Sequence, residues 1–201
     1  MRPGAWLQPA VLTGTLLPFG VLAYRAAGGH LGANPVATAL NQLGLLALVL
    51  LLASLACTPL KLVTGMKWPL KLRKTLGLAA FFAALAHLLV YAVLDQGLSW
   101  RTLAKDVLSR PFIAVGVSAV LIMTPLAVTS TKRALQRLGP RRWQKLHRLA
   151  YVAGVLGVVH YVLRVKADVR QPALYGALLA ASFAARLALG RTARKPPPSD
   201  A

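Results

Sequence analysis

Long stretches without a charged residue divide this chain into segments. Four of these stretches contain 20 or more residues: 22 between Arg2 and Arg25, 35 between Arg25 and Lys61, 20 between Lys74 and Asp95, and 21 between Arg110 and Lys132. Two shorter windows, 149–163 and 171–185, contain 15 residues each. A helix crosses a bilayer with about 20 apolar residues, and about 17 suffice where Arg or Lys at its ends can extend to the headgroups. The pattern therefore predicts a membrane protein.

We expect an all-α membrane protein whose fold is a bundle of six transmembrane helices with short connections. The expected spans are 9–24, 41–59, 76–94, 112–128, 146–163 and 173–189. Residues 9–189 then form one transmembrane domain, between an N-terminal segment, 1–8, and a proline-rich tail, 190–201. An alternative for the first segment is a cleaved signal peptide that ends near Ala26, which would leave five spans.

The charge balance predicts the orientation of the bundle. The chain has 24 Lys and Arg against 4 Asp and Glu, a net charge of +20. With six spans and both termini cytoplasmic, seventeen basic residues lie on the inner side and seven on the outer side. The positive-inside rule favours this orientation. Because the basic residues are divided among short loops instead of forming one stripe, we exclude nucleic acid as a partner.

Several enzyme classes are disfavoured by what the sequence lacks. It contains no glycine-rich phosphate loop, carboxylate pair or Ser-His-Asp set, so a hydrolase is hard to build. Cys57 is the only cysteine, which excludes a disulfide framework or a cysteine metal site.

The segment 96–110 is either an outer loop or a short interfacial helix around Trp100.

Histidine is the informative residue type. Three of the four histidines, His87, His147 and His160, lie in expected spans, where an ionisable group is costly and is functional by default. A packed neutral imidazole that hydrogen-bonds a neighbouring helix is the alternative. The fourth, His30, lies in an outer loop, where we expect a structural or exposed role.

Depth in the membrane separates these histidines into two levels. His87 lies roughly 20 Å and His160 roughly 25 Å from the inner ends of their helices, whereas His147 lies only roughly 6 Å in. Two imidazoles at one level on facing helices can supply both axial ligands of a haem iron. We therefore expect His87 and His160 to share one haem that His147 cannot reach.

Two arginines near the histidines are further candidates for cofactor binding. Arg164 follows His160 by four residues and lies on the same helical face, where it could pair with a haem propionate. Arg148 flanks His147 at the inner boundary. Basic residues that simply end the spans are the alternative interpretation of both positions.

Several segments together resemble one family. They are GANP at 32–35, WPLKLRKTLG at 68–77, RPFI at 110–113, PLAVTS at 125–130, WQKLHRLAY at 143–151, and the His160-Tyr161 pair. These segments resemble the MsrQ (YedZ) family, within the ferric-reductase-like transmembrane superfamily. The resemblance covers about residues 14 to 189 and keeps three histidines in place.

The resemblance implies a function that composition does not. The family is the haem-binding membrane subunit of a bacterial periplasmic methionine sulfoxide reductase system. Its members pass electrons from the quinone pool or a flavin reductase across the inner membrane to a periplasmic molybdopterin-containing partner, which carries out catalysis. By matching position, His87, His147 and His160 correspond to the family's haem-linked histidines. The cofactors implied are haem b and FMN.

Some assignments stay open at this point. Related two-haem reductases carry a second histidine about 13 residues before the first on helix three, where this chain has Lys74. A second haem on His147 would need a different sixth ligand, or His147 faces a flavin or a quinone. The basic segments 61–74 and 132–148 could attract the FMN phosphate by charge. Alternative functions are a stand-alone ferric or quinone reductase cytochrome, and a transporter or scaffold, which the lack of intramembrane carboxylates disfavours.

Overall fold

The structure is a computed structural model, and it describes residues 6–165 and 167–192. Within these residues all regular structure is helical: α1 (Leu7–Ala27), α2 (Pro35–Thr64), α3 (Trp68–Leu89), the π-helical turn η1 (Val90–Asp95), α4 (Trp100–Ser109), α5 (Pro111–Val128), α6 (Lys132–His147), α7 (Leu149–Arg164) and α8 (Arg170–Thr192). The predicted all-α class is confirmed. α8 continues into the first three residues of the predicted tail, and the rest of that tail lies outside the described residues.

Six helical stretches are long and apolar enough to cross a membrane. They are Leu7–Ala27, Pro35–Thr64, Trp68–Asp95, Pro111–Val128, Lys132–Arg164 and Arg170–Leu189. The chain is therefore a multi-pass membrane protein with six candidate spans, as predicted. Several helices extend beyond the expected spans: α2 runs through Pro35–Thr64, where the uncharged pattern predicts only 41–59.

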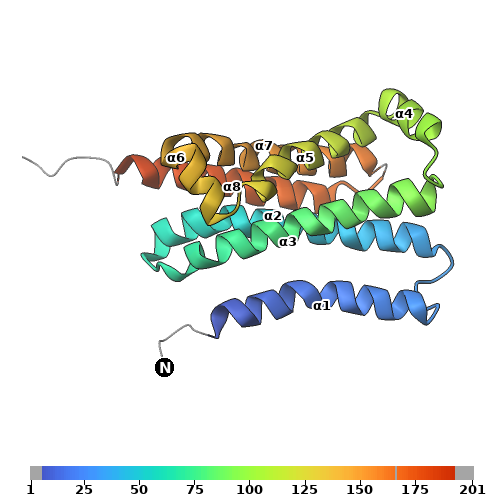
Figure 1. Cartoon of the computed structure of the whole chain (residues 1–201), viewed down its shortest axis with the longest axis horizontal. Coiled ribbons are helices and arrows are strands. Elements are labelled where there is room, and N and C mark those ends of the chain that lie inside the picture. The colour runs from blue at the N-terminus through green and yellow to red at the C-terminus, as the bar shows by residue number, and fades with distance from the viewer. Residues whose placement is uncertain (1–5, 166, 193–201) are drawn as a thin grey trace, which may run out of the picture.

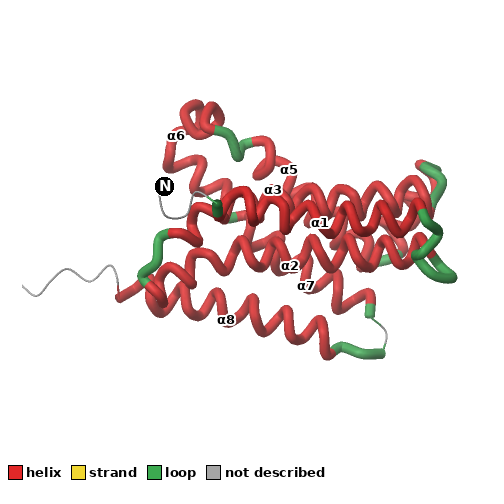
Figure 2. Tube along the Cα trace, turned by 90° about the horizontal axis from the view of Figure 1, so that it is seen from below, coloured by secondary structure: helices red, strands yellow, loops and turns green. Residues whose placement is uncertain are grey.

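The helices lie side by side with α2 at the centre (Figures 1 and 2). α2 packs on α3, α7 and α8, α5 packs on α7 and α3, and α1 lies at the edge against α3 and α2. The start of α1, α6 and the end of α8 share one end of the bundle, and α4 lies at the other (Figure 1). We call the end with α6 and the α2–α3 connection the basic end.

Local sequence signals explain where the central helices begin and end. The Asn34 side chain accepts a hydrogen bond of 3.0 Å from the Ala37 amide, and Pro35 follows at the first helical position, so α2 starts at the GANP segment. Gly65 ends α2 in the left-handed conformation, with φ 72°. α3 and α5 also begin with a proline in their first turn. Segments that resemble the MsrQ family thus act as helix starts.

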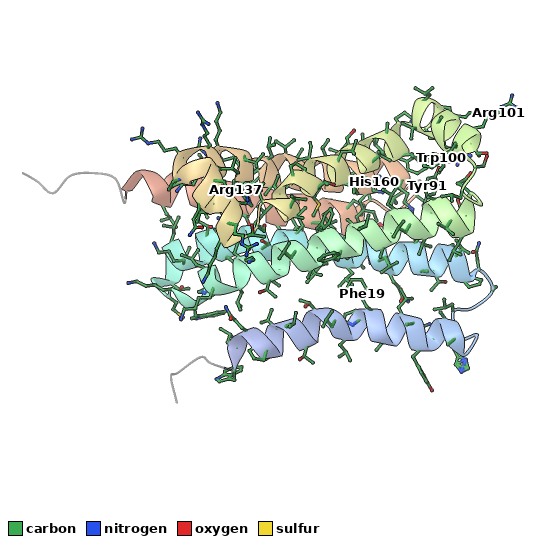
Figure 3. The ribbon with its side chains drawn as sticks, in the orientation of Figure 1. Phe19, Tyr91, Trp100, Arg101, Arg137 and His160 are labelled. Carbon is green, nitrogen blue, oxygen red and sulfur yellow. The ribbon has the colours of Figure 1, made fainter. Side chains whose placement is uncertain are left out.

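Two connections differ from a plain loop. Residues 132–145, expected to lie outside the fifth span, are helical as part of α6, with a break at Gly139, whose φ of 73° and ψ of 155° interrupt the helix. Residues 100–109 form α4, which settles the two alternatives for this segment in favour of a helix. Trp100 is 77% exposed, and Figure 3 shows Arg101 directed away from the bundle.

Candidate functional site

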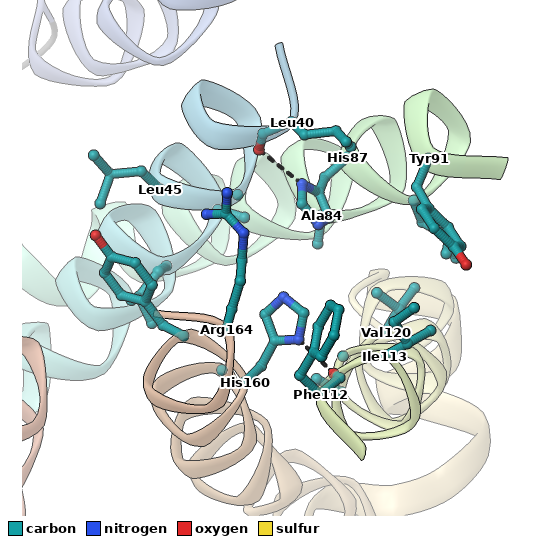
Figure 4. Close-up of a pocket in the computed structure, with 18 of the residues that line it drawn as sticks. Leu40, Leu45, Ala84, His87, Tyr91, Phe112, Ile113, Val120, His160 and Arg164 are labelled. Atoms are coloured by element: carbon teal, nitrogen blue, oxygen red, sulfur yellow. Dashed lines mark hydrogen bonds between the residues drawn. The ribbon is translucent and has the colours of Figure 1, made fainter. Parts of the chain in front are cut away.

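A cavity of about 510 Å³ lies between α2, α3, α5 and α7. Its walls are mainly apolar and include many small residues: Ala37, Gly44, Ala47, Ala84, Gly116, Ala119, Ala153 and Gly157. Two histidines, His87 from α3 and His160 from α7, enter it from opposite sides (Figure 4). We call this space the histidine-pair cavity.

The two histidine rings face each other across this cavity. Their centres are 6.1 Å apart and their planes are nearly perpendicular, at 87°. With a metal–nitrogen bond of about 2 Å on either side, the centres of two imidazoles that ligate one iron lie roughly 6 Å apart. The prediction from depth that these two residues lie at one level is confirmed.

Each ring is oriented by a backbone carbonyl of the neighbouring helix. His87 Nδ1 lies 2.9 Å from the Leu40 carbonyl oxygen on α2, and His160 Nδ1 lies 2.6 Å from the Phe112 carbonyl oxygen on α5 (Figure 4). A carbonyl only accepts, so each Nδ1–H donates and each ring keeps its Nε2 without a proton. This is the tautomer that a metal-ligating histidine requires.

A glycine makes room for each ring. Gly44 and Gly116 lie four residues after Leu40 and Phe112 respectively. A Cβ atom on Gly44 would lie 3.1 Å from the His87 ring, and one on Gly116 only 2.7 Å from His160 Nδ1. Sequence reasoning missed both positions, although a glycine inside a long apolar helix is a signal of close packing.

Polar side chains gather at the end of the histidine-pair cavity that faces α4. Arg164 and Arg110 line it, as does Tyr91 from η1. Tyr91 donates a 2.7 Å hydrogen bond to buried Asp106, whose other oxygen lies 3.4 Å from Arg110 Nε. Arg164 is placed beside the histidines as predicted, whereas the Tyr91–Asp106–Arg110 network was not anticipated.

A second cavity, of about 540 Å³, lies at the basic end. Polar residues that line it include Ser54, Arg73, Lys74, Ser130, Gln144, His147, Arg148, Tyr151 and Arg186. Leu51 and Met123, both buried, line this cavity and the histidine-pair cavity. The two spaces therefore adjoin along the bundle, with these side chains between them. We call the second space the basic-end cavity.

His147 lies in the basic-end cavity and is held differently from the other two histidines. Its ring stacks on Trp143 with centres 3.8 Å apart, and its Nε2 lies 3.1 Å from Thr129 Oγ1. The single hydroxyl proton of Thr129 is used by the 2.6 Å bond to the Pro125 carbonyl, so His147 Nε2 is left to donate. No second histidine lines this cavity within the described residues.

The other residues considered in the sequence analysis lie in the basic-end cavity, in a loop and inside α2. Arg148 lines the basic-end cavity next to His147. His30 is exposed in the loop before α2, and Cys57 is buried in α2. The described residues contain no cluster of three or more His, Cys, Asp or Glu side chains arranged to hold a metal ion. Two opposed imidazoles in an apolar slot instead fit a planar macrocycle whose own nitrogens complete the coordination.

Comparison with known proteins agrees with this geometry. Residues 39–158, from α2 into α7, match the family described as "Ferric reductase like transmembrane component". Relatives named "Protein-methionine-sulfoxide reductase heme-binding subunit MsrQ" include that of Rhodospirillum rubrum, 47% identical over 89% of this chain and 86% of the relative. That of Deinococcus radiodurans is 46% identical over 92% and 91%, respectively. No solved structure matches the chain.

A ferric-reductase-like transmembrane protein is therefore the class that the fold, the histidine pair and the family match define together. Within that class the chain belongs to the MsrQ family, since relatives of that name align with nearly its whole length.

Proposed function

We propose that this protein is a membrane cytochrome b that transfers electrons, with a haem b held between His87 and His160. The observation that carries the proposal is the pair of opposed imidazoles, 6.1 Å apart, each with its Nδ1 bound to a carbonyl and its Nε2 directed away from that bond. A haem bound there would supply a one-electron couple.

The residues of the chain would hold the haem in three ways. The Leu40 and Phe112 carbonyls fix the tautomer and orientation of the two rings. The small apolar side chains leave a mainly apolar slot, and Arg164 and Arg110 lie at its rim, where cations pair with carboxylates. A haem held by both His87 and His160 would offer no open coordination position to oxygen, which suits electron transfer.

We propose that the electrons pass to a periplasmic molybdopterin-containing methionine sulfoxide reductase subunit. The relatives are named as the heme-binding subunit of a protein-methionine-sulfoxide reductase, and a subunit of that name supports such a partner. The donor in this proposal is the quinone pool or a cytoplasmic flavin reductase. The two adjoining cavities support a route along the bundle, because Leu51 and Met123 line both.

The same proposal places the chain in the bacterial inner membrane with its basic end in the cytoplasm. Segment 61–74, α6 and Arg148 together carry twelve of the 24 basic residues, whereas Asp95 and Asp106 lie at the opposite end. That asymmetry supports the orientation by the positive-inside rule. Both termini are then cytoplasmic.

FMN, implied by the family resemblance, completes the proposed cofactors. A second haem, on His147, is the competing occupant of the basic-end cavity. It would require a non-histidine partner, and either ligation through His147 Nδ1 or loss of the bond between His147 Nε2 and Thr129. We therefore propose one haem, at His87 and His160.

The deciding experiment is an absorption spectrum of the detergent-purified protein, oxidised and dithionite-reduced, with haem quantified per chain. A low-spin b-type spectrum with one haem per chain is expected. Absence of haem after expression with ample haem supply would refute the proposal. Co-purification with a periplasmic molybdoenzyme separates this function from a stand-alone ferric or quinone reductase cytochrome.

A further inference from the structure

The helix α4 is too short to cross a bilayer, and the rest of the chain leaves most of it uncovered. Its ten residues extend over about 15 Å, whereas the hydrocarbon core of a bilayer is about 30 Å thick. It lies at the end of the bundle opposite the basic end, where it packs on α5 (Figure 1). Seven of its ten residues are exposed, so something other than this bundle determines which side chains its outer surface carries.

The exposed side chains of α4 form two rows of different chemistry. Residues four apart lie on the same face of a helix. The apolar row consists of Trp100, Ala104 and Leu108, all exposed, with Trp100 at 77% and Leu108 at 88%. The basic row consists of Arg101 and Lys105, also exposed, and it lies about 100° around the helix from the apolar row. Figure 3 shows Arg101 directed away from the bundle.

The remaining side of α4 is attached to the bundle. Asp106 is buried, accepts a 2.7 Å hydrogen bond from Tyr91 and lies 3.4 Å from Arg110 Nε. Leu103 and Val107, which neighbour Asp106 on the helix surface, are half-buried. These contacts fix the rotation of α4 about its own axis. The apolar row therefore faces outward because of how the helix is attached.

Exposed apolar side chains lead along the chain from the preceding span into the apolar row. Leu94, near the end of the span Trp68–Asp95, is 63% exposed, and Leu98, in the turn before α4, is 51% exposed. Gly97 and Leu98 both have positive φ, 58° and 56°, so the chain turns there before Trp100 begins the new helix. The apolar row thus continues the surface that the spans present to lipid.

We propose that α4 lies in the headgroup layer of the bilayer, with its apolar row against the acyl chains and its basic row on the phosphate groups of anionic phospholipids. A leaflet offers an apolar layer and an anionic layer side by side, as the two rows of α4 require. Tryptophan is enriched at this depth in membrane proteins. With the basic end in the cytoplasm, as proposed above, this is the outer leaflet. The inference does not depend on a bound haem.

The test compares two neighbouring positions on α4 in the full-length protein, reconstituted in nanodiscs of phosphatidylcholine and phosphatidylglycerol. Leu108→Cys places a nitroxide spin label on the apolar row, and Ser109→Cys places it four residues after Lys105, in line with the basic row. Power saturation measures collisions of the label with oxygen, which concentrates among acyl chains, and with a neutral nickel chelate, which stays in water. Oxygen should dominate at 108 and the nickel chelate at 109.

A second position and an unsubstituted control keep the proposal testable if one variant does not fold. Ala104→Cys, also exposed on the apolar row, should give the same result as Leu108→Cys. The wild type contains only Cys57, which is buried, and it measures background labelling.

The basic row is tested by changing the lipid and the charge. Omission of phosphatidylglycerol should reduce the excess of oxygen collisions at 108, because the basic row then loses its anionic partner. Arg101→Gln combined with Lys105→Gln should give the reduced value with or without phosphatidylglycerol. Arg137→Gln, at an exposed arginine on α6, is the matched control and should keep the lipid dependence.

Three results would overturn the proposal. If the nickel chelate reaches 108 as freely as 109, the apolar row faces water, and a soluble protein becomes its occupant. If 108 is shielded from both reagents, the row is covered by protein within the nanodisc. If the double variant and Arg137→Gln behave alike, the basic row does not bind anionic lipid. Haem spectra of the same samples report separately on the proposed cytochrome function.

Discussion

His87 on α3 and His160 on α7 face each other with ring centres 6.1 Å apart and ring planes at 87°. Neither ring hydrogen-bonds the other, because each Nδ1 is bound to a carbonyl on a third or fourth helix, Leu40 on α2 and Phe112 on α5. The pair is thus positioned by two helices, α2 and α5, that carry neither histidine. The distance between the two rings therefore depends on the packing of four helices, α2, α3, α5 and α7.

The first prediction concerns the three histidines within spans. His87→Ala or His160→Ala should abolish haem binding, because each removes one of two opposed imidazoles. His147→Ala should spare that haem, since His147 lies in the other cavity and bonds Thr129. Haem per chain and the reduced spectrum measure this. Equal haem loss in all three variants would contradict the separation into two levels.

The second prediction concerns the glycines behind the histidines. Gly116→Ala should cause the greater loss of haem, because its Cβ would lie 2.7 Å from His160 Nδ1 and displace the ring from the Phe112 carbonyl. Gly44→Ala, with a distance of 3.1 Å, should cause a smaller loss or a shifted spectrum. Gly20→Ala is the matched control, since open space surrounds that glycine on α1. A spectrum equally altered in all three would argue against a specific role.

Much of the fold could be predicted from the uncharged stretches, because a bilayer requires each span to be apolar and internally hydrogen-bonded. The residues at which the helices begin and end could not be predicted in this way. α2, for example, is capped by Asn34 and Gly65, which lie outside the apolar pattern. The helical conformation of 132–145 and its break at Gly139 also lie outside any span, where periodicity is weak.

The site was predictable only in part. The 3.6-residue period gives depth along a helix, so His87 and His160 could be placed at one level. Which helices face each other depends on packing, and one sequence does not show it. The contacts of the two histidines with the Leu40 and Phe112 carbonyls, and their close approach to Gly44 and Gly116, could therefore not be predicted. For the same reason the contact between Arg186 on α8 and the Tyr151 ring on α7 could not be predicted.

The third prediction concerns the Tyr91–Asp106–Arg110 network at the histidine-pair cavity. Tyr91→Phe should destabilise the protein by about 1–3 kcal/mol, because buried Asp106 loses its 2.7 Å hydrogen-bond donor. Thermal unfolding in detergent measures the effect. Tyr24→Phe is the control, since Tyr24 is 76% exposed and should leave stability unchanged. An equal unfolding temperature for both variants would mean that the network carries no stability.

The fourth prediction concerns Arg164 at the rim of the histidine-pair cavity. Arg164→Gln should lower the haem midpoint potential, because a nearby cation favours the reduced, less positive haem. A lost interaction of about 1 kcal/mol corresponds to roughly 40 mV for a one-electron couple. Arg101→Gln, at an exposed position on α4, should not change the potential. Equal potentials for wild type and Arg164→Gln in a redox titration would contradict a place for Arg164 in the proposed haem site.

The fifth prediction concerns orientation and uses cysteines introduced at the two ends of the bundle. Ser109 on α4 and Gln136 on α6 are exposed, whereas the native Cys57 is buried and should react slowly. If the basic end is cytoplasmic, a membrane-impermeant maleimide should label Ser109→Cys in spheroplasts and should label Gln136→Cys only after lysis. The physical reason is the excess of Lys and Arg on the α6 side, which favours retention in the cytoplasm during insertion. The opposite labelling pattern would invert the bundle and place the basic-end cavity, with its arginines, on the periplasmic side.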